Sequence, residues 1–135
     1  MSWRVVEEEC TQIDLWIATP SEGTAGHVAM MQALGDYVDR EGLCVTATRT
    51  FFRYTNGTEL GLKIGIRNYP RFPTEWSELI NHAELIGFEL AEVGGQQTFM
   101  IEDGSSVYWF TRNPEHHKEH HDWETPIAGG GYDVS

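Results

Sequence analysis

The chain is poor in basic residues and in cysteine and has no long apolar run, and each shortage excludes a class of protein. Its 135 residues carry nine Lys and Arg side chains against 21 Asp and Glu, a formal net charge of −12. Such an acidic chain is not expected to bind duplex nucleic acid through a general basic surface. Because no apolar run reaches the roughly 18–20 residues that cross a bilayer, we expect no membrane span.

The two cysteines, Cys10 and Cys44, are too few for a disulfide framework and favour a reducing compartment. Cys44 lies in the apolar run Leu43-Cys44-Val45, which predicts a small buried thiol. The acidic N-terminus lacks the basic and apolar regions of a signal peptide, so a cytoplasmic location is expected. The sequence contains no phosphate loop, GxSxG, GxGxxG or paired CxxC signature. We therefore expect no cofactor and favour a function other than catalysis.

What the chain does have is enough apolar and aromatic side chain, 40% and 12% of its residues, for one folded domain. We expect an acidic N-terminal segment at 1–11, a folded domain at 12–112 and an irregular His- and Gly-rich tail at 113–135. Alternating apolar residues predict a strand over 12–19. A helix over 24–40 should then bury the apolar residues that recur every three or four positions: Val28, Met31, Leu34 and Val38.

The middle of the domain carries a hairpin signal. Asn56-Gly57 separates two β-rich runs, at 43–55 and from Leu60 onward, and Asn-Gly is a strong signal for a tight hairpin turn. Pro70 and Pro73 should end the second strand, because proline cannot donate to a β-ladder.

A second helix should begin after Thr74 as its N-cap and continue to about Val93. Its expected buried stripe consists of Trp76, Leu79, Ile80, Ala83, Ile86, Gly87 and Leu90. A strand over 97–102 and a short one over 107–111 follow. The order is that of the α+β, ferredoxin-like βαββαβ sandwich, with two helices on one face of an antiparallel sheet and an extra C-terminal strand. The other sheet face is left to water, a ligand or a second subunit of a homodimer.

Charge is unevenly distributed along this plan. Residues 45–73 contain five basic side chains and one acidic one, a local charge of +4 that leaves −16 for the remainder. Four carboxylates lie opposite the apolar stripe of the second helix: Glu75, Glu78, Glu89 and Glu92. Such a face is most often only solvated, but it also fits docking on a basic surface of a host or defence protein.

The hairpin supports an alternative function, the binding of a small anionic ligand or nucleotide. Strand alternation groups Lys63 and Arg67 with glycines that allow close approach, and puts two aromatic rings on the preceding strand. The candidate ligand-binding residues are Phe52, Tyr54, Lys63, Arg67, Tyr69 and Arg71.

The tail contains four histidines in six residues: His116, His117, His120 and His121. If the segment were helical, the i,i+4 pairs could each place two imidazoles on one metal ion. The pattern lacks the Glu of an HExxH site, so a solvated tail is favoured over a metal site.

Three segments resemble a pattern in small proteins of tailed bacteriophages and prophages: GLCVT at 42–46, FFRYTN at 51–56 and GIRNYPRFP at 65–73. The resemblance covers about residues 12–112, and NYPRFP is its most distinctive part. The turn reads Thr-Gly-Gly in that pattern and Thr-Asn-Gly here. The resemblance implies a viral setting, in the cytoplasm of a bacterial host, and favours an accessory protein that binds and inhibits a host or defence protein.

Overall fold

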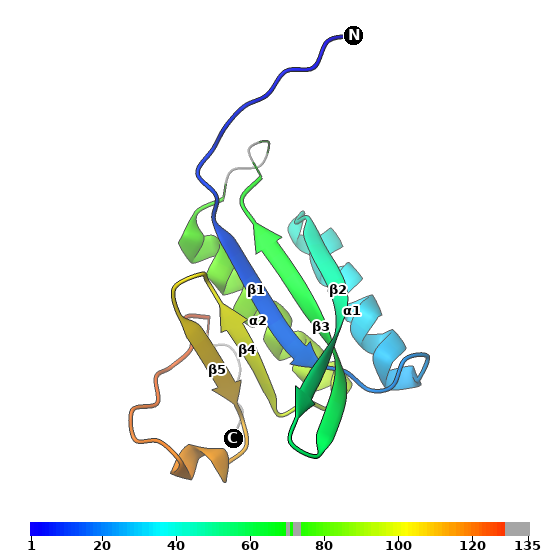
Figure 1. Cartoon of the computed structure of the whole chain (residues 1–135), viewed down its shortest axis with the longest axis vertical. Coiled ribbons are helices and arrows are strands. Elements are labelled where there is room, and N and C mark those ends of the chain that lie inside the picture. The colour runs from blue at the N-terminus through cyan, green and yellow to red at the C-terminus, as the bar shows by residue number, and fades with distance from the viewer. Residues whose placement is uncertain (70, 72–73, 129–135) are drawn as a thin grey trace.

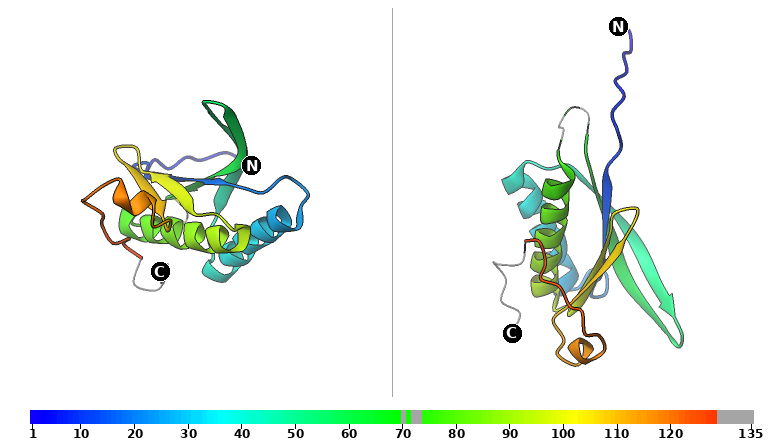
Figure 2. Two further views of the ribbon diagram at one scale, coloured as in Figure 1. Left: turned by 90° about the horizontal axis from the view of Figure 1, so that it is seen from below. Right: turned by 90° about the vertical axis from the view of Figure 1, so that its left-hand side faces the viewer.

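The computed structural model describes residues 1–69, 71 and 74–128, and within them the elements follow the predicted order. They are β1 (Gln12–Ala18), α1 (Ala25–Glu41), β2 (Val45–Tyr54), β3 (Gly57–Arg67), α2 (Trp76–Gly94), β4 (Thr98–Glu102), β5 (Val107–Thr111) and the short 3-10 helix η1 (His116–Lys118). The strands form one antiparallel sheet in the order β2-β3-β1-β4-β5, and α1 and α2 cover the same face of it (Figure 1 and Figure 2). This is the predicted α+β, ferredoxin-like plan, extended by β5 at one edge.

β1 lies in the middle of the sheet and supplies the centre of the core. As its alternation predicts, Ile13, Leu15 and Ile17 are all buried, with exposed fractions of 1% or less. Across the β1–β3 ladder, Leu15 pairs with the buried Ile64. Full burial of such a side chain contributes about 1.5–3 kcal/mol, so this central strand anchors the fold.

The predicted buried face of α1 is wrong at two positions. Val28 is 54% exposed and Met31 36% exposed, while the helix buries Met30, Leu34 and Tyr37. A pattern restricted to aliphatic residues overlooked Tyr37, whose hydroxyl lies 2.8 Å from the Nδ1 atom of His82 on α2. The phenol packs between the helices because that contact satisfies its polar end.

α2 buries the predicted stripe except at its first residue, Trp76, which is 40% exposed. The helix begins one residue later than expected. Its N-cap is Glu75 rather than Thr74, and no side chain caps it. The C-cap, Gly95, has φ +68°, a conformation that favours glycine.

The β2–β3 hairpin extends beyond the helical layer and curves away from it (Figure 2). Leu60, in its outer half, is therefore 37% exposed. The turn is centred on Thr55 and Asn56, one residue earlier than predicted, because Gly57 already pairs with Tyr54. The expected strand breakers Pro70 and Pro73 lie outside the described residues.

The environment of Cys44 differs from the one predicted from its apolar neighbours. Cys44 is exposed rather than buried, because it lies between α1 and the edge strand β2. Neither helix in the described part of the chain has the length and apolarity needed to cross a membrane.

Candidate functional site

The sheet face opposite the helices carries a cluster of aromatic and charged side chains. In the ladders, Trp16 lies directly opposite Lys63, and Phe52 lies opposite Glu59. Residues directly opposite each other project to the same face of a sheet. We call this surface the open face, and its central group, the Trp16 cluster, consists of Asp14, Trp16, Phe52, Lys63 and Glu102.

Trp16 is held by three of these neighbours. Its indole N–H donates to the Glu102 carboxylate at 2.9 Å. The Trp16 and Phe52 rings pack edge to face, with 6.5 Å between their centroids. The Lys63 ammonium lies 5.3 Å from the indole centroid, a cation–π distance. It is also 3.9 Å from the Asp14 carboxylate. The result is a fixed aromatic surface with charges of both signs at its rim.

Glycine is required beneath the cluster. A Cβ atom on Gly61 would lie 2.8 Å from the carbonyl oxygen of Ile17 and would also contact the Phe52 ring. The missing side chain at Gly61 therefore lets Phe52 lie across β3 toward Trp16. From the sequence, glycine on this strand was expected to let a ligand approach closely. At Gly61 the group that approaches is instead the Phe52 ring of the same chain.

The open face continues along the projecting hairpin to Tyr54 and Glu59. The Tyr54 hydroxyl donates to the Glu59 carboxylate at 3.2 Å, and Tyr54 is 51% exposed. Partial desolvation, this hydrogen bond and the negative charge of Glu59 all raise the pKa of Tyr54. The phenol therefore stays protonated, as a donor, over the physiological pH range.

The predicted ligand residues do not form one site. Phe52, Tyr54 and Lys63 lie together on the open face, and Arg67 lies further along β3, where it donates to Gln12 at 3.2 Å. Tyr69 lies elsewhere and lines a separate pocket. Three carboxylates of the open face were not predicted as site residues, although strand alternation assigns each of them to the face away from the core: Asp14, Glu59 and Glu102.

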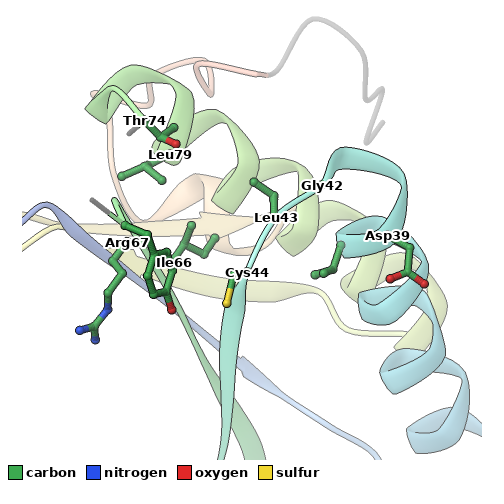
Figure 3. Close-up of a pocket in the computed structure, with 10 residues that line it drawn as sticks. Asp39, Gly42, Leu43, Cys44, Ile66, Arg67, Thr74 and Leu79 are labelled. Atoms are coloured by element: carbon green, nitrogen blue, oxygen red, sulfur yellow. The ribbon is translucent and has the colours of Figure 1, made fainter. Parts of the chain in front are cut away.

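That separate pocket, of about 370 Å³, lies where α1 ends and β3 leaves the sheet. Figure 3 shows Cys44, Leu43 and Asp39 around it, with the Arg67 side chain turned away. A hydrogen bond with the Cys44 thiol and partial burial raise the pKa of Tyr69, which also lines it. Arg71, the last predicted ligand residue, is exposed.

The predicted acidic face is divided by ion pairs. Glu89 pairs with Arg40 at 3.0 Å, and Glu92 pairs with Arg112 at 2.7 Å. Glu75 and Glu78, near the start of α2, are exposed. The strongest part of this face is therefore the first turn of the helix.

The histidine-rich segment does not form the helix that its i,i+4 pairs required, because η1 ends at Lys118. Within 1–69, 71 and 74–128, no group of three His, Cys, Asp or Glu side chains could hold a metal ion. Instead, rings of the tail surround Trp109: His116 at 5.1 Å, Trp123 at 5.9 Å and His120 at 6.5 Å between centroids.

Fold and open face together define a small ferredoxin-like domain with an aromatic, charged sheet surface. No protein-family model and no curated protein sequence matches the chain. Among solved structures, it resembles a phage SAM lyase in complex with S-methyl-5′-thioadenosine, with a TM-score of 0.57 and 13% identity over 82% of this chain and 96% of that one. A phage SAM lyase in the apo state gives 0.51 and 15% identity over 75% and 88%. At these identities the likeness shows a shared fold.

Proposed function

We propose that this chain is a phage accessory enzyme that binds SAM (S-adenosylmethionine) on the open face and cleaves it. The observation that carries the proposal is the match in fold to nearly the whole of a phage SAM lyase, 96% of its chain. The resemblance of three sequence segments to phage and prophage proteins supports the same setting. The proposal replaces the non-enzymatic function favoured by motif absence alone, since short signatures cover few classes of enzyme.

The open face supplies groups suited to each part of SAM. Adenine can stack on the Trp16 indole, as bases stack on aromatic side chains in other sites. The sulfonium needs a carboxylate or an aromatic face near it, and Glu59 and Glu102 border the rings. Lys63, beside Trp16, is placed for the carboxylate of the amino-acid portion. With Glu59 and Glu102 beside its rings, the open face suits a cationic nucleoside better than the anionic ligand or nucleotide expected from the sequence.

Cleavage requires only that the bond between sulfur and the amino-acid side chain breaks. The electron pair of that bond remains on sulfur, which leaves as the neutral thioether of S-methyl-5′-thioadenosine. The four-carbon fragment completes its valence by bonding to its own carboxylate oxygen or by losing a neighbouring proton to a base. In this proposal Glu59 stabilises the sulfonium, and Tyr54 orients the carboxylate.

Incubation with SAM should test this function directly. We expect release of S-methyl-5′-thioadenosine, followed by chromatography with mass detection, and no incorporation of ¹⁸O from labelled water into the four-carbon product. Glu59→Gln should slow the release by about 100-fold or more, the size of effect seen when one preorganised electrostatic group is removed. The control is Glu8→Gln, in the exposed N-terminal segment.

Two results would contradict the proposal: no product and no binding at millimolar SAM, or SAM binding that perturbs only residues away from the open face. In an NMR titration the second result would appear as a shift of the indole signal of Trp76, in the helical layer, without a shift of Trp16.

A second candidate function is binding of a basic host or defence protein through the first turn of α2. The exposure of Glu75 and Glu78 favours it, because these carboxylates lie where a partner can reach them. Both carboxylates lie at the N-terminus of α2, where the helix dipole stabilises negative charge. The helix end itself does not attract a basic partner, so the attraction must come from the two carboxylates.

The double variant Glu75→Lys, Glu78→Lys should slow association with a captured host partner by about tenfold or more at low salt, and less at high salt. The matched control reverses two charges in the N-terminal segment, Glu7→Lys and Glu8→Lys. Equal association rates for the two variants, measured by surface plasmon resonance, would exclude the helix face as the interface.

A further inference from the structure

A groove runs along the outer edge of β5, on the side away from β4. After η1 the chain passes beside this edge and then back along α2 (Figure 1 and Figure 2). We call residues 119–128 the strap. The groove, of about 970 Å³, lies between the strap, α2 and β5. Consecutive residues, 108–112, line it, whereas a pocket on one sheet face would be lined by every second residue. The groove therefore follows the edge of the sheet.

The backbone of β5 presents hydrogen-bonding groups to this groove. At the end of the strand, the Arg112 amide donates to the carbonyl oxygen of Gln97 at 3.0 Å, toward β4. Because successive residues of an antiparallel strand bond to opposite sides, the amides and carbonyls of Val107 and Trp109 point away from β4. Within the described residues, no backbone hydrogen bond joins the strap to β5. The groove thus contains an open sheet edge.

Contacts at both ends fix the strap as the far wall of the groove. Near η1, the Trp123 indole N–H donates to the carbonyl oxygen of His117 at 3.0 Å. The His117 ring in turn donates to the carbonyl oxygen of Thr111 at 3.0 Å, which closes this end of the edge. At the other end, the Ala128 amide donates to the carboxylate of Glu84 at 2.6 Å. Glu84 is 3% exposed, so this contact ties the strap to the body of α2.

The two sides of the β5 edge differ in their surroundings. Phe110 pairs with Phe99, which is buried, so Phe110 faces the helices. Trp109 pairs with Met100 and therefore projects to the open face, where its ring lies 5.9 Å from that of Trp123 between centroids. A strand added to β5 would place alternate side chains on these two sides. One row would meet the phenylalanines, and the other would meet the two indoles.

The charges in the lining favour a basic partner. With His117 neutral, four carboxylates and one guanidinium line the groove: Glu84, Glu92, Asp122, Glu124 and Arg112. Arg112 is already paired with Glu92 at 2.7 Å. Asp122 and Glu124 are exposed and flank Trp123 in the strap. Because indole faces also attract cations, Lys or Arg suits the row on the indole side, and apolar residues suit the row on the helix side.

We propose that the groove takes up an extended basic peptide of a partner protein, which adds to the sheet as an antiparallel neighbour of β5. Its backbone bonds to the outward amides and carbonyls of Val107 and Trp109. Its apolar side chains pack on Phe110, and its Lys or Arg side chains lie over Trp109 and Trp123. In this mode of recognition, main-chain hydrogen bonds give affinity and alternate side chains give specificity. The interaction goes beyond the proposed SAM function, because it uses the sheet edge and not the Trp16 cluster.

A hexapeptide of alternating Val and Lys, blocked at both ends, is the probe for this groove. In an NMR titration of the full chain, we expect it to shift the amide signals of Val107 and Trp109 and to slow their hydrogen exchange. Directly opposed residues share a sheet face, so the peptide residue that bonds to Trp109 is a Lys. Methylation of the Lys backbone nitrogens should therefore weaken binding by about tenfold or more. The matched control carries the same methyl groups on its Val nitrogens, which point away from β5, and should bind more tightly than the Lys-methylated peptide.

Proline tests the same edge from the protein side. Val107→Pro removes an outward amide and leaves the β4 ladder intact, a change that edge strands tolerate. It should weaken peptide binding by about tenfold or more. The matched control is Ala47→Pro at the opposite edge. Because the Thr19 amide donates to the Leu60 carbonyl, Leu60 bonds to β1, and alternation then points the Ala47 amide outward from β2. Ala47→Pro should leave the affinity unchanged.

Three results would overturn the proposal: no amide shift at millimolar peptide, equal binding of the two methylated peptides, or equal loss of affinity in Val107→Pro and Ala47→Pro. Replacing each Lys of the probe with Glu should weaken binding by about tenfold or more, since the lining is negative. Trp16→Ala should leave peptide affinity unchanged. A failure of this site and a failure of the proposed SAM function therefore give different results.

Discussion

Replacing Gly87 with valine should destabilise the protein by about 3 kcal/mol, although valine forms helix better than glycine does. A Cβ atom at this position of α2 would lie 2.6 Å from the Cζ atom of Phe99. Phe99 is 6% exposed and stacks on Phe110, so it cannot move aside without opening the core. The cost of overpacking therefore exceeds the gain in helix propensity.

Gly35→Val provides the matched control, because Gly35 is also inside a helix but nothing lies within 4 Å of its Cβ position. We expect a change within about 0.5 kcal/mol there. Urea unfolding followed by circular dichroism measures both variants. Similar free energies of unfolding for the two would mean that α2 does not pack on Phe99 as described.

Trp16→Ala should weaken SAM binding by about 10- to 100-fold, the range expected when one base loses its aromatic stacking partner. Trp16 is the ring that the cluster holds in place, through its bond to Glu102 and its contacts with Phe52 and Lys63. Isothermal titration calorimetry with SAM, or with S-methyl-5′-thioadenosine, gives the affinity.

Trp16→Phe keeps a ring but removes the indole N–H, so it should retain most of the binding. Trp76→Ala, at the exposed start of α2, removes an indole of the same size from the helical layer, on the other side of the sheet, and should have no effect. If Trp76→Ala and Trp16→Ala weakened binding equally, the open face would not be the ligand site.

Sequence patterns were most informative where burial is one-sided and regular. Ile13, Leu15 and Ile17 alternate because β1 has one buried face, and a period of two is visible without any tertiary information. The face of α1 was harder to predict, because two stripes compete. The one that contains Tyr37 is buried, and the hydroxyl of Tyr37 meets His82, 45 residues away, which no local pattern reveals.

The candidate sites depended even more on the tertiary structure. Trp16 and Glu102 are 86 residues apart, and only the β1–β4 pairing brings the indole to the carboxylate. Glu84 lies at helical spacing within the apolar stripe, between Ile80 and Gly87, but its charge argued for an exposed position. In the structure its carboxylate accepts a hydrogen bond from the amide of Ala128, in the C-terminal segment that composition alone predicts as an irregular tail.

The central position of β1 has a consequence for how the chain folds. β1 needs β3 on one side and β4 on the other, and Asp14 pairs with both Gly65 and Glu102. Closing contacts over such sequence separations slows folding. During synthesis, a chain that has emerged only as far as α2 would leave one edge of β1 unpaired and open to aggregation. The domain therefore matures as a single cooperative unit, and only after most of its length has left the ribosome.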